Sequence, residues 1–155
     1  MSWQEAQKSG SGTGFTFLRG THILTGETVA IKILEKNRIR EVADVERVSR
    51  EILILKRLRH HQVVHLHEVV DTPKQIYLIM EFANGGELFD YIVAHQRIKE
   101  RQAALLFHQI CDGVQYLHDN GVIHRDLKSQ NIFLMKTGRV LLGDFGIASR
   151  LDAPD

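Results

Sequence analysis

The stretch His124-Arg125-Asp126-Leu127-Lys128-Ser129-Gln130-Asn131 is the most informative part of this sequence. It places a carboxylate at Asp126, a cation at Lys128 and an amide at Asn131 within one short segment. An apolar helical pattern precedes this segment, and a short apolar strand pattern follows it. A second acidic turn, Asp144-Phe145-Gly146, comes shortly afterwards. A base, a cation and oxygen donors this close together indicate a candidate catalytic loop.

Length and composition limit the class of protein. The chain has 155 residues, enough for a core in one domain or two small lobes. It is 43% apolar and 25% charged, which is typical of a soluble globular protein. Its net charge of +1 predicts neither nucleic-acid nor membrane binding. There is no bilayer-spanning apolar run and no signal segment. A single cysteine, Cys111, excludes an internal disulfide, so we expect a cytoplasmic or nuclear protein.

The first 80 residues predict an antiparallel sheet with one helix. Glycines at residues 10–14 and Thr25-Gly26 indicate turns, and Val29-Ala30-Ile31-Lys32-Ile33 indicates a strand. Two more strands are expected near residues 63–70 and 76–80. Between them and the first strands, the period changes to that of an amphipathic helix from about Glu41 to Leu58. Its expected apolar face consists of Val42, Val45, Val48, Ile52 and Leu55.

The remaining residues predict a mainly helical part. Ala83-Asn84-Gly85-Gly86 separates the two patterns, so we predict a first lobe at residues 1–80, a hinge at 81–86 and a second lobe at 87–155. A helix is expected from Glu87, and a longer one over 101–120 that ends at Asn120-Gly121. The expected inward residues of the longer helix are Leu105, Leu106, Ile110, Cys111, Val114 and Leu117. A hairpin is expected from the strands near 132–134 and 140–142.

With these motifs the chain resembles the eukaryotic protein kinase family, from the glycine cluster to just past Asp144-Phe145-Gly146. The resemblance implies an α+β fold, an antiparallel β N-lobe with one helix and the first helical part of the C-lobe. Lysine two places after Asp126 is similar to the serine/threonine branch. Residues 72–77 and 85–92 resemble AMP-activated and calcium/calmodulin-group kinases, whereas residues 128–134 and 142–148 resemble NIMA-related kinases.

The resemblance also implies roles for individual residues. Asp126 is expected to accept the substrate hydroxyl proton, and Lys128 to neutralise the transferred phosphate. Asn131 and Asp144 are the expected magnesium ligands. The residues expected to bind ATP or to complete its site are Gly10, Gly12, Gly14, Ala30, Lys32, Glu51, Met80, Glu81, Ala83 and Phe133. Among these, Lys32 is expected to contact the α- and β-phosphates while Glu51 holds its ammonium.

More of the site follows from the same resemblance. Ala30 and Phe133 are expected to enclose adenine, with Met80 as gatekeeper and the backbone of residues 81–83 as the adenine-binding hinge. Glu87 is expected to favour a basic residue upstream of the target serine or threonine. A regulatory spine is expected from Leu55, Leu66, His124 and Phe145.

Taken singly, several of these parts have a simpler interpretation. A strand lysine and a helix glutamate are usually a surface pair of little energetic value. A lone Asp-Phe-Gly is usually a turn, and a glycine cluster alone is weak evidence for a phosphate loop. The string from His124 to Asn131 is more specific, because six specified residues at fixed spacing rarely arise by chance. All parts also occur in the expected order, which favours the kinase interpretation.

Besides His61, which stands where the family usually has proline and is expected to change only a loop, two features depart from the family pattern. The glycine cluster runs Gly10-x-Gly12-x-Gly14-Phe15-x-Phe17, so the third glycine and the aromatic residue have exchanged places. Phe15 therefore carries a Cβ where a bare backbone is expected to approach phosphate. The second departure is the end at Asp155, before any Ala-Pro-Glu motif. We expect ATP binding by these residues alone, but not efficient phosphorylation of proteins.

The sequence thus predicts a serine/threonine protein kinase that uses ATP and Mg²⁺. One alternative is a truncated, non-catalytic ATP-binding or regulatory interaction module, and another is that the 155 residues are an incomplete part of a longer enzyme. Expected partners are proteins with target serines or threonines and a regulatory subunit or full-length kinase, with no nucleic acid and no membrane. Lys32→Met separates the alternatives, because it should abolish transfer but leave partner binding by a non-catalytic module unchanged.

Overall fold

The computed structural model describes residues 3–12 and 15–151, which fold into two compact units. The first unit comprises Met1–Glu46 and His65–Phe82, and the second comprises Arg47–Val64 and Ala83–Asp155. The second unit thus begins again at Ala83, within the predicted hinge, but it also includes residues 47–64, which the prediction gave to the first lobe. The division into kinase lobes stays a prediction.

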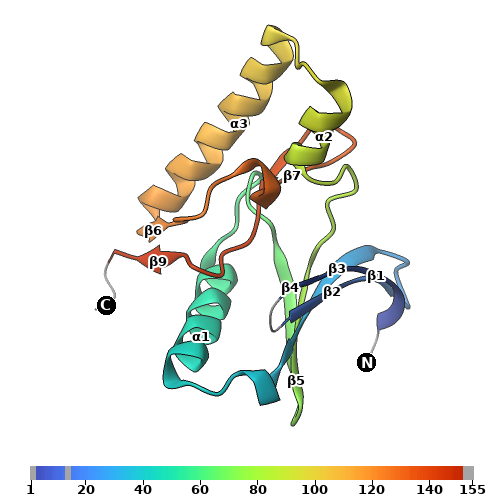
Figure 1. Ribbon diagram of the computed structural model, residues 1–155, viewed down its shortest axis with the longest axis vertical. Coiled ribbons are helices and arrows are strands. Elements are labelled where there is room, and N and C mark those ends of the chain that lie inside the picture. Colours follow the sequence, from blue (N-terminus) through green and yellow to red (C-terminus); the bar gives the residue numbers. More distant parts are fainter. Residues whose placement is uncertain (1–2, 13–14, 152–155) are drawn as a thin grey trace. The chain divides into compact units, whose positions relative to one another are not determined.

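The first unit is built on a five-stranded antiparallel sheet in the order β1-β2-β3-β5-β4 (Figure 1). The strands are β1 (Trp3–Gly12), β2 (Phe15–His22), β3 (Thr28–Glu35), β4 (Leu66–Asp71) and β5 (Gln75–Glu81). A short 3-10 turn, η1 (Lys36–Arg38), follows β3. The β-branched residues Val29, Ile31 and Ile33 alternate along β3 and pack with Ile79 of β5 into a buried cluster. This alternation places Ala30 and Lys32 on the opposite face of the sheet.

The glycine cluster differs from its prediction as a turn. Strand β1 continues through Gly12, which pairs with Phe15 of β2, so Gly10 and Gly12 lie in a strand. A shift in register lies between Lys8 and Gly10. Gly14 lies outside the described residues. Glycine is a poor strand former in isolation, and pairing with β2 overrides that local preference.

The second unit contains most of α1 (Val42–Arg57) together with α2 (Leu88–His95) and α3 (Glu100–Asp119). Short strands complete it: β6 (Val122–Ile123) pairs with β9 (Ser149–Arg150), and β7 (Ile132–Leu134) pairs with β8 (Val140–Leu142). A 3-10 turn, η2 (Ser129–Asn131), leads into β7. Helix α3 ends as predicted, because Asn120 caps it and Gly121 follows with a φ of +69°. Together the sheet and helices confirm the predicted α+β class.

The faces of the two long helices differ in part from the prediction, although Leu55, Leu106 and Leu117 are buried as predicted. In α1, Val42 is 76% exposed and Val45 is 52% exposed, whereas Glu51, Ile54 and Leu55 are buried. Val42 lies nine positions before Glu51, about two and a half turns, and therefore on the opposite side of the helix.

Among the described residues, none of the helices has the length and apolar character that crossing a bilayer requires.

In α3, Leu105 is 60% exposed and Cys111 is also exposed, so neither is the core residue that the sequence predicted. The buried residues are Leu106, Gly113 and Leu117. A Cβ on Gly113 would lie 2.8 Å from Leu142 Cδ1, so the bare backbone of Gly113 is the point of closest approach to β8. Cys111 lies two positions, about 200°, away from that point and therefore faces outward.

This close approach makes Gly113→Ala a test of the packing of α3. Leu142 is fully buried and has little room to move, so we expect a loss of about 1–3 kcal/mol in the free energy of unfolding from overpacking. The loss should occur although alanine is the better helix former by about 1 kcal/mol. Urea denaturation measures it. Gln102→Ala, at an exposed position of α3, is the control, and a Gly113→Ala variant of unchanged or higher stability would contradict the packing argument.

Candidate active site

The candidate catalytic loop runs from His124 to Asn131, between β6 and β7 of the second unit. The loop begins directly after β6, and η2 closes it where the backbone N–H of Asn131 donates to the carbonyl of Lys128 at 2.9 Å. Arg125 adopts a φ of +69°, a left-handed conformation that costs a non-glycine residue about 1–2 kcal/mol. The loop therefore turns sharply between the buried His124 and the partly exposed Asp126.

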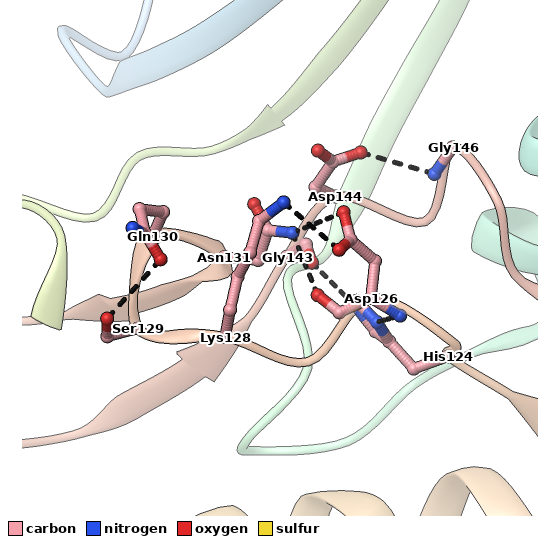
Figure 2. Close-up of polar contacts among 9 residues, drawn as sticks. All are labelled: His124, Asp126, Lys128, Ser129, Gln130, Asn131, Gly143, Asp144 and Gly146. Atoms are coloured by element: carbon pink, nitrogen blue, oxygen red, sulfur yellow. Dashed lines mark hydrogen bonds and ion pairs between the residues drawn. The ribbon is translucent and has the colours of Figure 1, made fainter. Parts of the chain in front are cut away.

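His124 joins this loop to the segment that follows β8. Its side chain is 2% exposed, and Nε2 lies 2.7 Å from the carbonyl oxygen of Gly143 (Figure 2). A carbonyl only accepts, so Nε2 carries the hydrogen, and Nδ1 is left to accept from the backbone N–H of Asp126 at 3.2 Å. The imidazole also packs against the Phe145 ring, with centroids 4.9 Å apart. One buried side chain thus positions both acidic segments of the site.

Gly143 completes this connection from the other side. Its backbone N–H donates to the carbonyl of Asn131 at 3.0 Å. Both the N–H and the carbonyl of Gly143 are therefore hydrogen-bonded to the catalytic loop. A Cβ on Gly143 would lie 2.7 Å from Phe133 Cε2 and 2.9 Å from Cδ2. The Phe133 ring therefore occupies the space that any larger residue at 143 would need. Gly143 was not among the predicted site residues, although a glycine between an apolar strand and the acidic turn is a signal of close approach.

Asp126 is held by two partners. Lys128 Nζ lies 3.0 Å from its Oδ1, and Asn131 Nδ2 donates to its Oδ2 at 2.9 Å. The hydrogen bond from Lys128 and, after it, the one from Asn131 hold the pKa of this carboxyl below its ordinary value. The carboxylate therefore remains ionised at neutral pH. Its role as a base stays a prediction.

Asn131 and Asp144 provide oxygen donors beside this carboxylate. Asn131 Nδ2 donates to both the carbonyl oxygen and Oδ2 of Asp126, each at 2.9 Å. Asp144 is exposed, has a φ of +52°, and accepts from the N–H of Gly146 at 3.2 Å. Figure 2 shows the Asp144 carboxylate gathered with the Asn131 amide and the Asp126 carboxylate. An amide oxygen and a carboxylate are hard ligands that suit Mg²⁺.

The other predicted residues lie in both units. In the first unit, Ala30 pairs with Met80 and Lys32 pairs with Leu78, so Ala30, Lys32 and Met80 share one face of the sheet. Lys32 is 6% exposed. At the end of β5, the backbone N–H of Glu81 donates to the carbonyl of His65 at 2.8 Å. The second unit contains Glu51, which is 5% exposed, and the half-buried Ala83 and Phe133. The nucleotide-binding roles of these residues stay predictions.

Lys128→Met tests what controls Asp126. Because the variant removes the hydrogen bond from Lys128, the largest cause of the lowered pKa, we expect the pKa of Asp126 to rise toward its ordinary value. A ¹³C carboxyl titration by NMR measures this change. A carboxyl whose pKa is lower in the folded state than in the unfolded state contributes stability that is lost as the pH falls through the folded-state pKa. When the pH is lowered, the free energy of unfolding of the variant should therefore fall less than that of the unaltered chain. Lys136→Met, at an exposed turn lysine, is the control; an unchanged Asp126 pKa in Lys128→Met would refute the assignment.

His124→Phe tests the connection through Gly143. The variant keeps an aromatic ring against Phe145 but leaves the buried Gly143 carbonyl without its donor. We expect a loss of about 1–3 kcal/mol in the free energy of unfolding, the cost of one buried unsatisfied group. Urea denaturation gives this value. His95→Phe is the matched control, because His95 is exposed where it stacks on Tyr91, and an equal loss in both variants would contradict a special role for His124.

Similarity to known proteins shows which family the chain belongs to. A family model described as "Protein kinase domain" matches residues 3–155. The chain is also similar to CBL-interacting protein kinase 17 from Oryza sativa subsp. japonica, with 43% identity over 128 residues. That match covers 83% of this chain but only 28% of the rice protein, so the chain spans little more than a quarter of that relative's length. With the catalytic loop and the acidic turn in place, the chain belongs to the protein kinase family.

Proposed function

We propose that this chain is the catalytic part of a serine/threonine protein kinase that transfers the γ-phosphoryl group of ATP to protein hydroxyls. The observation that carries the proposal is the ionised carboxylate of Asp126, hydrogen-bonded by Lys128 and Asn131 and gathered with Asp144. The family match over residues 3–155 supports the same activity. Lysine at position 128 favours serine and threonine over tyrosine, by the resemblance drawn from the sequence.

The chemistry follows from these groups. The substrate hydroxyl oxygen forms a bond to the γ-phosphorus, the bond from that phosphorus to the β–γ bridging oxygen breaks, and ADP leaves. The hydroxyl proton passes to the Asp126 carboxylate. Its bonds to Lys128 and Asn131 keep the carboxylate in one orientation, so little reorganisation is needed when the proton arrives. The Lys128 ammonium also balances negative charge on the transferred group.

Magnesium and the nucleotide complete the proposal. Asn131 and Asp144 would hold Mg²⁺, which when bound neutralises charge on the ATP phosphates. Ala30, Met80, the backbone of residues 81–83 and Phe133 are assigned to adenine. Lys32 is assigned to the α- and β-phosphates, with Glu51 as its anionic partner. The glycines at positions 10, 12 and 14 are assigned to the phosphates.

The peptide substrate is the remaining part of the proposal. Glu87 precedes α2, and burial and then the nearby charge of Asp90 raise the pKa of its carboxyl. A cationic substrate residue would relieve the repulsion between these two carboxylates, so we assign Glu87 to a basic residue upstream of the target. The rice relative is named as CBL-interacting, and a regulatory protein partner also belongs to this proposal.

Asp126→Asn tests the activity. We expect kcat to fall about 10²- to 10⁴-fold, the usual contribution of a general base, while the Kd for ATP stays unchanged. The measurement is transfer from γ-labelled ATP to a peptide with one serine and an upstream arginine. The same peptide with tyrosine in place of serine should remain unlabelled. Asp119→Asn, at an exposed carboxylate of α3, is the matched control.

Two outcomes would contradict the proposal. If Asp126→Asn retained the kcat of the unaltered chain, Asp126 would not be the base. Because the chain alone is not expected to phosphorylate proteins efficiently, slow labelling of the peptide is sufficient. ATP binding without any labelling would favour the non-catalytic ATP-binding module. Lys32→Met distinguishes a loss of nucleotide binding from a loss of chemistry, because it is expected to weaken ATP binding whereas Asp126→Asn is not.

A further inference from the structure

Lys32 has an unusual neighbour for a residue assigned to phosphate. Its Nζ lies 5.0 Å from the centroid of the Phe15 ring, within the range of a cation–π contact. The Lys32 side chain is only 6% exposed. Little of Lys32 is therefore open to an approaching anion, and the Phe15 ring is one of the groups beside its ammonium.

The register of the sheet places the Phe15 ring there. Phe17 pairs directly with Lys32 across β2 and β3, and Phe15 pairs with Leu34. Phe15 is therefore the diagonal neighbour of Lys32 on the same face, within reach of a long side chain. The Phe15 and Phe17 rings also meet edge to face, with centroids 5.5 Å apart and planes at 80°. This contact braces the Phe15 ring over the ammonium.

The position of Phe15 in the chain matters as well. It forms the end of the β1–β2 ladder, where it pairs with Gly12. The buried cluster lies on the other face of the sheet, so the ring can leave Lys32 without disturbing that cluster. Phe15 also stands where the kinase pattern has its third glycine. A glycine at this position would make no cation–π contact with Lys32.

We propose that the Phe15 ring and the nucleotide phosphates compete for the Lys32 ammonium, so that Phe15 determines how tightly this chain binds ATP. The proposal rests on the proposed function in one respect, the assignment of Lys32 to the phosphates. ATP binding displaces the ring, and a charge-assisted hydrogen bond to phosphate replaces the weaker cation–π contact. The contact thus lowers the apparent affinity for phosphate-bearing ligands. Ligands without phosphate are unaffected.

The test compares ATP and adenosine binding by calorimetry in the 155-residue chain. Phe15→Leu keeps an apolar side chain but removes the ring, so it should bind ATP about 2- to 30-fold more tightly, the range expected for one cation–π contact. Phe15→Gly should gain at least as much. Adenosine affinity should not change in either variant. Adding Lys32→Met to Phe15→Leu should abolish the gain, and Thr16→Ala, at the adjacent position, should bind ATP as the unaltered chain does.

A second measurement requires no substitution. The Phe15 ring current should shift the Lys32 ε-methylene protons in the free chain, and saturating ATP should remove that shift. Persistence of the shift in the ATP complex would overturn the proposal, as would equal ATP affinity of Phe15→Leu and the unaltered chain. If Lys32→Met still weakened ATP binding in that case, the proposed function would stand. Failure of every variant to bind either ligand would overturn both proposals.

Discussion

The arrangement of the candidate site depends on the peptide groups of one small residue. Gly143 gives its N–H to the carbonyl of Asn131 and receives a hydrogen bond from His124 at its own carbonyl. Because Gly143 is buried, losing either partner would leave a polar group without compensation. These two bonds fix the acidic turn against the catalytic loop. The missing side chain has a second effect, since it lets the Phe133 ring pack across the backbone. One glycine therefore couples the proposed metal ligands to the residue proposed to contact adenine.

Strain is concentrated on both sides of this connection. Arg125 and Asp144 have φ values of +69° and +52°, and each is adjacent to a residue that the connection holds. Glycine would adopt these angles without cost, but Asp144 supplies a carboxylate that glycine lacks. The strain is offset by the burial of His124 and Phe145, whose rings pack together, and by the bond from Gly146 N–H to Asp144. Such strain is found where a functional side chain must point in one direction.

The parts of the site that sequence could predict are those held by short-range contacts. Asp126, Lys128 and Asn131 lie within one loop, where Asp126 is bonded to the other two, and their spacing together with the resemblance to the kinase family indicated a common site. The helices and most of the longer strands were also predictable from periodicity, whereas the two-residue strands β6 and β9 and the glycine end of β1 were not. The helix faces were not, because the valine pattern of α1 and the outward position of Cys111 depend on what each helix packs against. Gly113 has no side chain to register in a pattern, yet it sets the contact of α3 with β8.

The same distinction explains the environment of Lys32. In the sequence, Phe15 is only a local departure from a glycine pattern, 17 positions before Lys32. Its physical effect appears only through the register of β2 on β3, which brings the two side chains onto one face. A shift of one residue would send Phe15 to the other face, against the buried cluster. Phe15, standing in place of a glycine, therefore affects Lys32, which is far from it in the sequence, as well as the shape of the glycine segment. A change in a phosphate-binding motif is therefore best judged by the partner that the strand register gives it.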